Sequence, residues 1–442
     1  MNKLMNWLEK YITPLAAKLG NQRHLVSIRD GIIVTMPLII VGSLFLIVAN
    51  LPIPGFGDMM AHLFGEKWQD KLTYPVGATF DIIGLVVSFG VAYRLAERYR
   101  VDPVSAGVIS LAAFILTTPH EMLYATAAGK SELVTGVLPV SLLSSKGIFI
   151  AMIFALISTE IYRIIVQKDI TIKMPPTVPP AVAKSFAALI PAFAVLVVVW
   201  LIRLAVAYTP WKDIPTMIST LISMPLKHLG GGLGGILIAV FCIQLLWVVG
   251  LHGDAIVGSI MMPIWLALMD ENRKVFMAHP HADLPNVVTS QFYEVWTTVG
   301  GSGFTIALVL YYLFLARSKQ LKQLGSLAIG PAIFNINEPV IFGTPIVMNP
   351  MLIIPFIFAP LVIVLVTYLS MDMGLVAKPS GVAVPWTTPI FISGLLASGG
   401  KLSGAVIQLV DLLLALLIYY PFFRMLDKQH YREERAAEAP EQ

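Results

Sequence analysis

The residues with the clearest chemical potential lie in one short stretch, residues 335–343, which reads Asn-Ile-Asn-Glu-Pro-Val-Ile-Phe-Gly. Its carboxylate, Glu338, lies in a very apolar chain, where a charge at membrane depth is costly unless it faces a cavity or a partner. Pro339 removes a backbone donor and disfavours helix at the residue before it. Irregular backbone at that depth is tolerated only where it lines protein or water. We therefore interpret this stretch as the broken tip of a re-entrant segment that faces a polar ligand.

A histidine and two tryptophans interrupt other apolar runs in the second half of the chain. His252 follows Trp247 in the sequence Trp-Val-Val-Gly-Leu-His-Gly, where glycines open the backbone around the imidazole. A lone intramembrane histidine is often a core residue bonded to a neighbouring helix, but it can also bind a hydroxyl or exchange a proton near neutral pH. Trp247 and Trp386 can stack on a sugar ring, although tryptophan also favours membrane interfaces.

Two amides and a glycine-rich run complete the polar set. Asn335 and Asn337 flank Glu338, and carboxylate and amide groups together can read the donor and acceptor positions of sugar hydroxyls. Gly301 and Ser302 lie in a Gly-Gly-Ser-Gly run, which either makes a turn at a helix start or lets the backbone approach a ligand closely. The run lacks the Gly-Lys-Ser/Thr of a phosphate-binding loop. The candidate site therefore comprises Glu338, His252, Asn337, Trp386, Trp247, Gly301, Ser302 and Asn335.

A superficially metal-like cluster is better explained by solvent. His279, His281 and Asp283 lie in a polar stretch that begins at Asp270, and no further ligand has a recognisable spacing. We predict a solvated loop over residues 270–285, no metal site and no cofactor.

Three further residues are predicted to be structural. Asp81 and Glu160 fall inside apolar runs of the first half, where they can pair with neighbouring helices. Cys242 is the single cysteine, so an intramolecular disulfide and a CxxC metal site are both excluded. Its apolar surroundings favour a buried packing thiol.

Composition indicates an integral membrane protein. The chain has 442 residues, of which 57% are hydrophobic and 13% charged, whereas soluble domains carry about 25% charged residues. The formal net charge of +4 is spread along the chain, which argues against a nucleic-acid partner. The basic residues are better explained as topology signals of a protein in the lipid bilayer.

Apolar runs of about 20 residues divide the chain into spans. The predicted spans are residues 31–51, 72–93, 103–118, 147–166, 185–208, 233–250, 303–316, 350–370 and 403–423. The stretch from 119 to 145 is predicted to be a polar loop, and the tail from Glu433 to Gln442 to be disordered. Basic loops after the second and fourth spans, with a basic N-terminus, place both termini in the cytoplasm under the positive-inside rule.

A change of pattern divides the chain into four parts. Residues 1–208 form a five-span scaffold after an amphipathic N-terminal helix, and residues 209–232 form an interfacial connecting helix. Residues 233–425 hold the polar breaks and form the ligand-binding part. Residues 426–442 form a cytoplasmic tail.

Together these motifs resemble the sugar-transporting membrane subunit, the IIC component, of the bacterial phosphoenolpyruvate-dependent phosphotransferase system, in its lactose/cellobiose/diacetylchitobiose branch. The similarity runs nearly from end to end. It is carried by residues 28–31 (Ile-Arg-Asp-Gly), 250–253 (Gly-Leu-His-Gly), 300–303 (Gly-Gly-Ser-Gly), 337–343 (Asn-Glu-Pro-Val-Ile-Phe-Gly) and 385–387 (Pro-Trp-Thr).

The resemblance implies an all-α polytopic membrane protein with about ten transmembrane helices and two re-entrant hairpins. It implies a homodimer built mainly by the N-terminal half, and a C-terminal transport domain that moves as an elevator. The sugar-contacting histidine and glutamate of the family fall on His252 and Glu338, and the glutamate faces the C6 hydroxyl that becomes phosphorylated. Asn337 and Trp386 also match family positions.

The resemblance further implies that the phosphate comes from a cysteine on a phosphorylated IIB protein, supplied in turn through IIA and HPr. A β-linked disaccharide, of the cellobiose type, is the expected substrate in the bacterial cytoplasmic membrane. An ion-coupled or facilitative sugar transporter remains an alternative, with Glu338 or His252 as its proton-coupling group. Concentrative uptake of unmodified sugar would support that alternative. A purely regulatory membrane receptor is a third class, and the polar breaks argue against it.

Overall fold

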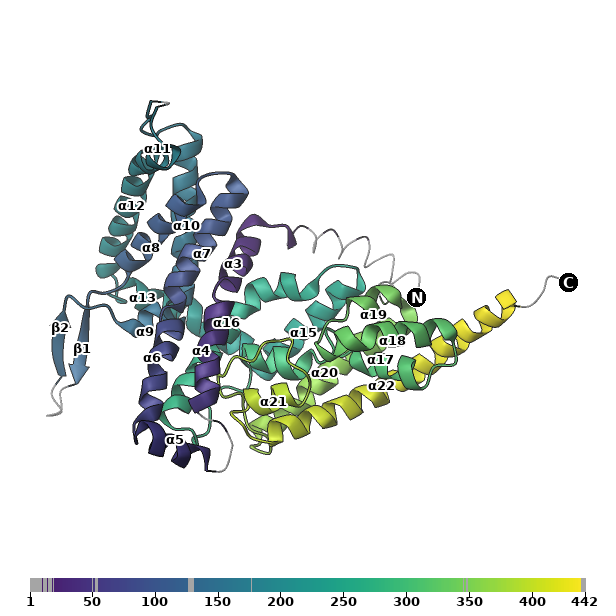
Figure 1. The fold of residues 1–442 in the computed structure, drawn as a ribbon. Coiled ribbons are helices and arrows are strands. Elements are labelled where there is room, and N and C mark those ends of the chain that lie inside the picture. Colours follow the sequence, from purple (N-terminus) through teal and green to yellow (C-terminus); the bar gives the residue numbers. More distant parts are fainter. Residues whose placement is uncertain are drawn as a thin grey trace.

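The structure, a computed structural model, is a helical protein whose two halves lie side by side (Figure 1). The predicted amphipathic N-terminal helix falls largely outside the described residues, so it stays a prediction. The described residues are 20–49, 55–125, 131–175, 177–344 and 349–438, with Lys10, Pro14, Lys18, Leu51 and Ile346.

The first half is an upright bundle of helices, drawn from purple to dark teal in Figure 1. Its elements are α3 (Arg23–Ile33), α4 (Met36–Ala49), α5 (Phe56–Phe64), α6 (Trp68–Phe80), α7 (Ile83–Tyr99), α8 (Pro103–Thr117), β1 (Glu121–Ala125), β2 (Ser131–Thr135), α9 (Val140–Leu143), η2 (Ser145–Gly147), α10 (Ile148–Gln167), α11 (Pro180–Ala187) and α12 (Leu189–Ala207).

Small residues let the helices of this bundle approach closely. A side chain at Gly31 of α3 would lie 2.5 Å from the backbone nitrogen of Val91, and one at Gly90 of α7 would lie 2.7 Å from the carbonyl of Gly31. Close backbone approach at small residues is the usual packing of helices in lipid. Glu160 accepts hydrogen bonds from Tyr99 and Arg163, so its predicted structural pairing is confirmed.

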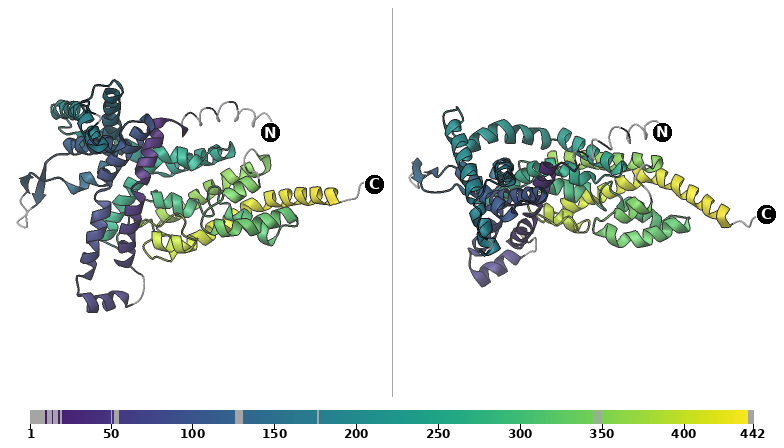
Figure 2. Two further views of the ribbon diagram at one scale, coloured as in Figure 1. Left: turned by 45° about the horizontal axis from the view of Figure 1, so that its top comes forward. Right: turned by 90° about the horizontal axis from the view of Figure 1, so that it is seen from above.

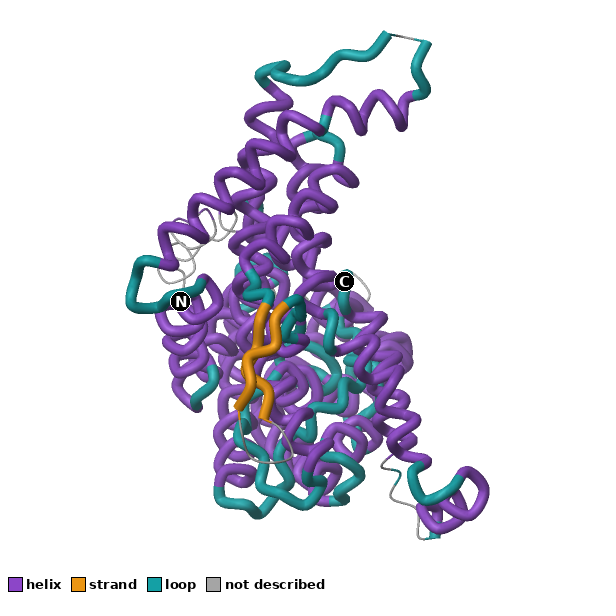
Figure 3. The backbone as a smooth tube through the Cα atoms, turned by 90° about the vertical axis from the view of Figure 1, so that its left-hand side faces the viewer, coloured by secondary structure: helices purple, strands orange, loops and turns teal. Residues whose placement is uncertain are grey.

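The predicted polar loop over 119–145 is wrong in part, because it contains a β-hairpin. Strands β1 and β2 pair antiparallel, with Glu121 opposite Thr135 and Ala125 opposite Ser131. The hairpin projects from the bundle at the left of Figure 1, and its two strands face the viewer in Figure 3. Tyr124, Val134 and Thr135 are residue types with high β propensity. Leu123 and Leu133, which lie opposite each other across the hairpin, are 70% and 58% exposed.

The predicted connecting segment is a continuous helical stretch that begins at an aspartate cap. Asp213 accepts the backbone N–H of Thr216 at 2.7 Å. The stretch ends at a glycine run, where a side chain at Gly235 would lie 2.0 Å from the carbonyl of Leu229, and the chain bends by 76° into the next helix. Its elements are α13 (Ile214–Ile218), the π-helical η3 (Ser219–Ser223) and α14 (Met224–Gly230).

The second half combines long helices with short ones that end in irregular backbone. Its elements are α15 (Leu233–Val248), α16 (Gly253–Ala278), the π-helical η4 (Phe292–Thr297), α17 (Ile306–Phe314), α18 (Lys319–Ile333), α19 (Glu338–Gly343), α20 (Pro350–Asp372), α21 (Ile392–Ala397) and α22 (Ser403–Glu438).

Among the described residues, seven helical segments are long and apolar enough to cross a membrane, or eight if the bent segment over 214–248 counts as one. The predicted span over 303–316 is wrong, because only the nine residues of α17 are helical there, and about 20 residues are needed to span. Helix α17 instead packs against α18 as a hairpin. The implied count of ten spans stays a prediction.

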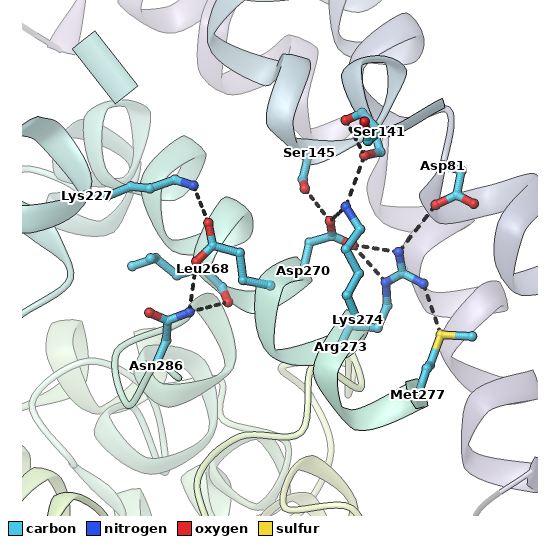
Figure 4. A network of polar contacts seen from close by, with 12 residues as sticks. Asp81, Ser141, Ser145, Lys227, Leu268, Asp270, Arg273, Lys274, Met277 and Asn286 are labelled. Atoms are coloured by element: carbon cyan, nitrogen blue, oxygen red, sulfur yellow. Dashed lines mark hydrogen bonds and ion pairs between the residues drawn. The ribbon is translucent and has the colours of Figure 1, made fainter. Parts of the chain in front are cut away.

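The predicted loop that begins at Asp270 is also wrong, because those residues belong to α16. Asp270 accepts Arg273 Nε at 2.8 Å and pairs with Lys274 Nζ at 2.6 Å, and it also accepts the hydroxyl of Ser145. Arg273 reaches Asp81 at 3.4 Å (Figure 4). Mutual neutralisation lets these charges stay inside the helical layer, and the network joins α16 to the first half. The solvated loop begins at His279 instead.

The disordered tail predicted from Glu433 is wrong up to Glu438, where α22 ends. The helix extends well past its neighbours (Figure 2). Glu434 explains the order, because its carboxylate accepts the Ser318 hydroxyl at 2.6 Å and the backbone N–H groups of Lys319 and Gln320 at 3.0 and 2.9 Å. Glu434 thereby caps the first turn of α18.

Candidate functional site

A cavity of about 260 Å³ lies in the second half, where irregular segments meet. Loop ends before α16 and α19, the turn after η4, and the segment at Trp386 each contribute to its wall. All eight residues singled out in the sequence line it: Trp247, His252, Gly301, Ser302, Asn335, Asn337, Glu338 and Trp386.

The turn between α15 and α16 places the first two of these residues. Gly250 adopts φ 80°, a conformation that glycine reaches without strain. A side chain at Gly253 would lie 2.1 Å from the carbonyl of Ile243, so the turn packs tightly on α15. His252 then caps α16, and its Nδ1 accepts the backbone N–H of Ala255 at 3.2 Å. In a neutral imidazole this leaves the proton on Nε2, which can donate to a ligand.

Asp254 organises this corner of the cavity. Its carboxylate accepts Trp247 Nε1 at 2.6 Å and the Ser302 hydroxyl at 2.7 Å, and it also accepts the hydroxyl of Tyr293. Trp247 is held further by the ring of His252, whose centroid lies 4.5 Å away. These bonds fix the indole and imidazole planes before a ligand arrives.

The glycine-rich run makes a turn that only glycine adopts readily, as well as a close approach. Gly300, Gly301 and Gly303 adopt φ of 70°, 87° and 84°. A side chain at Gly301 would lie 2.3 Å from Cγ of Asn337. The two interpretations of this run therefore hold together, because the turn brings the backbone directly against the amide of Asn337.

Asn335 ties three segments together. Its Oδ1 accepts the N–H of Gly300 at 2.8 Å, and its Nδ2 donates to the carbonyls of Trp386 and Thr388 at 2.6 and 3.1 Å. Asparagine tolerates the left-handed φ of 63° that this position has. The amide therefore locks the turns that carry the other site residues.

Glu338 and Asn337 begin α19, as the proline at the second position favours. Asn337 is 4% exposed, and its Nδ2 donates to the carbonyl of Ser302 at 2.6 Å. The Glu338 side chain is exposed to the cavity, with no hydrogen bond to any residue that the structure describes. Its carboxylate oxygens are thus available to a ligand. Trp386 is 45% exposed on the cavity wall, whereas Trp247 is 7% exposed.

Two carboxylates of the cavity were not assigned to it from the sequence. Asp254 and Glu294 line the cavity but are not among the eight residues predicted from the sequence. Glu294 lies on η4 and accepts Gln291 Nε2 at 3.0 Å. A carboxylate among the aromatic residues Phe292, Tyr293 and Trp296 was the available signal, since an ionisable group in an apolar segment marks a site by default.

The cavity is rich in acceptors of hydrogen bonds. Three carboxylates and an imidazole face it, and no lysine or arginine is among the described residues that line it. Such a lining suits a neutral ligand with many hydroxyl donors, and the two indoles offer apolar faces to a sugar ring.

Residues 29–360 match the family model described as "Phosphotransferase system, EIIC". The chain belongs to the phosphotransferase system EIIC family. It is the sugar-specific membrane subunit of such a system, and it is 60% identical over 437 residues to the "PTS system cellobiose-specific EIIC component" of Geobacillus stearothermophilus, covering 99% of this chain and 97% of the relative. The "Lichenan permease IIC component" of Bacillus subtilis (strain 168) is 56% identical over 439 residues, with 99% and 97% covered.

A solved EIIC structure has the same fold. The transporter ChbC, "the IIC component from the N,N'-diacetylchitobiose-specific phosphotransferase system", superposes with a TM-score of 0.94 at 54% identity, covering 97% of this chain and 99% of that chain. The predicted family and the all-α membrane architecture are therefore confirmed for this EIIC chain.

Proposed function

We propose that this EIIC chain carries a β-linked disaccharide of the cellobiose type and presents its C6 hydroxyl for phosphorylation by a separate IIB protein. The observation that carries the proposal is the cavity itself, in which seven polar or aromatic residues and Gly301 converge from distant segments. Relatives named for cellobiose and N,N'-diacetylchitobiose support a β-linked substrate.

The free groups of the cavity suggest a division of roles. Glu338, which has no partner among the described residues, accepts the C6 hydroxyl proton as a general base does. His252 donates its Nε2–H to a sugar hydroxyl. Trp386 and Trp247 stack on the sugar rings. Asn337, with Ser302 and Gly301, shapes the wall, while Asn335 positions the turns rather than the sugar, since its amide is already bonded at both ends.

The phosphoryl donor is a phosphocysteine of the partner IIB protein, recharged through IIA and HPr. The sugar oxygen forms a bond to phosphorus as the sulfur–phosphorus bond breaks, and the electron pair leaves with the thiolate. This chain's Cys242 does not suit that role, because it is half-buried and faces an apolar groove with Leu246 and Ile260. The thiol that the sequence predicts to be buried is thus only partly buried.

A binding screen tests the substrate. Purified protein in detergent should bind cellobiose, and should bind maltose, its α-linked isomer, about tenfold more weakly. The changed linkage leaves hydrogen-bonding groups of the site unpaired, which costs about 1–3 kcal/mol, and 1.4 kcal/mol is a factor of ten. Isothermal titration with cellobiose, N,N'-diacetylchitobiose, lactose and maltose gives the ranking. Equal affinity for maltose and cellobiose would refute the β-linkage.

Gly301→Ala should weaken cellobiose binding by about tenfold or more, because hydrogen-bonding groups of the displaced wall that are left unpaired cost about 1–3 kcal/mol and 1.4 kcal/mol is a factor of ten. The added methyl would lie 2.3 Å from Asn337, at a φ of 87°. Gly330→Ala is the matched control, since a side chain there meets nothing within 4 Å. Cellobiose titrations of both variants, with gel filtration to confirm folding, make the comparison. Wild-type affinity in Gly301→Ala would contradict this account of the wall.

The oligomeric state, the roles of the four parts of the chain and the location of its termini are further proposals. We infer a homodimer through the first half, with residues 1–208 as scaffold, 209–232 as connector, 233–425 as the moving transport domain and both termini in the cytoplasm. Helix α12 offers an apolar face for the contact between the two copies, since Phe193, Trp200 and Leu201 expose 72%, 49% and 52% of their surface. Light scattering of the detergent-solubilised protein tests the dimer, and a monomeric mass would refute it.

A further inference from the structure

A second cavity adjoins the candidate site and is walled on its other side by the first half of the chain. It has a volume of about 390 Å³ and shares His252, Asp254, Glu294 and Trp386 with the candidate site. Helices α3 and α4 contribute its far wall, from Arg29 to Ile40. We call this space the α3 cavity. Its shared lining means that a group leaving or entering the candidate site on this side meets residues of α3.

Arg29 is the one lysine or arginine among the described residues that line either cavity. The remaining ionisable lining is acidic, with Asp254, Glu294 and Glu338, apart from the imidazole of His252. A phosphoryl group brought among three carboxylates is repelled unless a cation accompanies it. A guanidinium is well suited to that task, because its planar fork of donors matches phosphate oxygens.

The Arg29 guanidinium is held in place by a carboxylate that occupies only part of its hydrogen-bond donors. Its Nε donates to Asp30 Oδ1 at 2.8 Å, and its Nη2 lies 2.6 Å from the same oxygen. Arg98 of α7 donates to the other Asp30 oxygen at 2.9 Å, so the carboxylate is anchored to the scaffold. Nη1 has no hydrogen bond to a described residue, and the side chain is 31% exposed. Donors therefore remain free on a fixed cation.

We propose that Arg29 binds the phosphoryl group while it passes from the IIB phosphocysteine to the sugar. This rests on the proposed function. Phosphorus gains a bond to the sugar C6 oxygen and loses its bond to sulfur, the electron pair stays on the partner's thiolate, and the hydroxyl proton goes to Glu338. Arg29 forms no covalent bond. It offsets the negative charge on the phosphoryl oxygens, which is the main way that proteins accelerate this transfer.

The position of Arg29 ties this chemistry to conformation. Arg29 lies on α3 in the first half, whereas Glu338 and His252 lie in the second half. The phosphate-binding cation and the sugar therefore meet only when α3 faces the cavity, as it does here through its packing on α16. Movement of the second half away from α3 would separate them, and sugar phosphorylation would be confined to one conformation.

The test compares Arg29→Gln and Arg29→Lys with the control Arg94→Gln, whose arginine pairs with Glu97 and lines neither cavity. We expect Arg29→Gln to phosphorylate saturating cellobiose about 10²- to 10³-fold more slowly with phosphorylated IIB. It should bind cellobiose 6-phosphate about tenfold more weakly, with cellobiose affinity unchanged. Arg29→Lys should recover part of both losses, and Arg94→Gln should match wild type.

Other outcomes would overturn the proposal. If Arg29→Gln weakens cellobiose and cellobiose 6-phosphate equally, Arg29 reads the sugar rather than the phosphate. If rate and product affinity both stay at wild-type values, Arg29 has no role at this site. If no IIB partner phosphorylates cellobiose together with the wild-type protein, the proposed function is wrong. The affinities for cellobiose and cellobiose 6-phosphate, measured by titration, still decide whether Arg29 binds phosphate. Unchanged cellobiose affinity also shows that the variants are folded.

Discussion

Glu338→Gln should lower the rate of sugar phosphorylation by about 10²- to 10⁴-fold, the usual contribution of a general base. The amide keeps the shape of the side chain but cannot accept the C6 hydroxyl proton. The fold should persist, because Glu338 makes no hydrogen bond to the described residues and its side chain is exposed. The measurement is the initial rate of sugar 6-phosphate formation in membranes supplied with phosphorylated IIB, normalised to folded protein.

The matched control for that substitution is Glu132→Gln, a carboxylate on the exposed strand β2. It should phosphorylate sugar at the wild-type rate. Undiminished activity in Glu338→Gln would remove the general base from the mechanism and leave Glu338 as a binding group at most.

The same variant separates binding of substrate from release of product. A phosphate dianion next to Glu338 is repelled by like charge, so the phosphorylated sugar should bind wild-type protein more weakly than the sugar does. Neutral glutamine removes that repulsion, so cellobiose 6-phosphate should bind Glu338→Gln more tightly than wild type. Together with Arg29, this would give the cavity a cation that favours phosphoryl transfer and an anion that favours release.

The candidate site was predictable to the extent that its residues broke apolar runs. His252, the glycine run, Glu338 and Trp386 each interrupt a stretch of lipid-compatible sequence, and all of them line one cavity. The groups that the sequence left unassigned are those that act through contacts between distant segments. Asp254 matters because Trp247, Tyr293 and Ser302 all donate to it, and a single sequence does not reveal such convergence.

The sequence predicts the wrong local structure where charges neutralise one another in space. Four charged residues within five positions from Asp270 are typical of a loop, but here Asp81 of the first half and the Ser145 hydroxyl help to bury two of them, Asp270 and Arg273, in α16. The predicted disorder of the tail is wrong up to Glu438 for a related reason. Glu434 is ordered by hydrogen bonds from the backbone of α18, more than 100 residues earlier in the chain. In both cases a tertiary partner overrides local polarity.

Asp270→Asn should destabilise the protein by about 3–5 kcal/mol, the cost of leaving a buried ion-pair partner without its counter-charge. The Asp270 and Arg273 side chains are 2% and 4% exposed. Without the carboxylate, Asp81 at 3.4 Å is the one acidic partner left to Arg273 among the described residues, and Lys274 loses its 2.6 Å partner. Thermal unfolding in detergent, followed by the aggregation temperature and by retained cellobiose binding, measures the loss.

We expect the loss of charge, rather than a change of shape, to cause the lower stability of Asp270→Asn. Two further variants test this. The double variant Asp270→Asn/Arg273→Gln removes the unpaired cation and should regain part of the lost stability. Glu97→Gln is the matched control, since Arg94 and Glu97 form a pair of the same i, i+3 spacing with side chains 42% and 40% exposed, and exposed pairs contribute about 0–1 kcal/mol. A double variant no more stable than Asp270→Asn would contradict the charge argument and point to the Ser145 hydrogen bond instead. Either result measures how much the Asp270 network stabilises the contact between α16 and the first half. The first turn of α16 lines the cavity through Asp254.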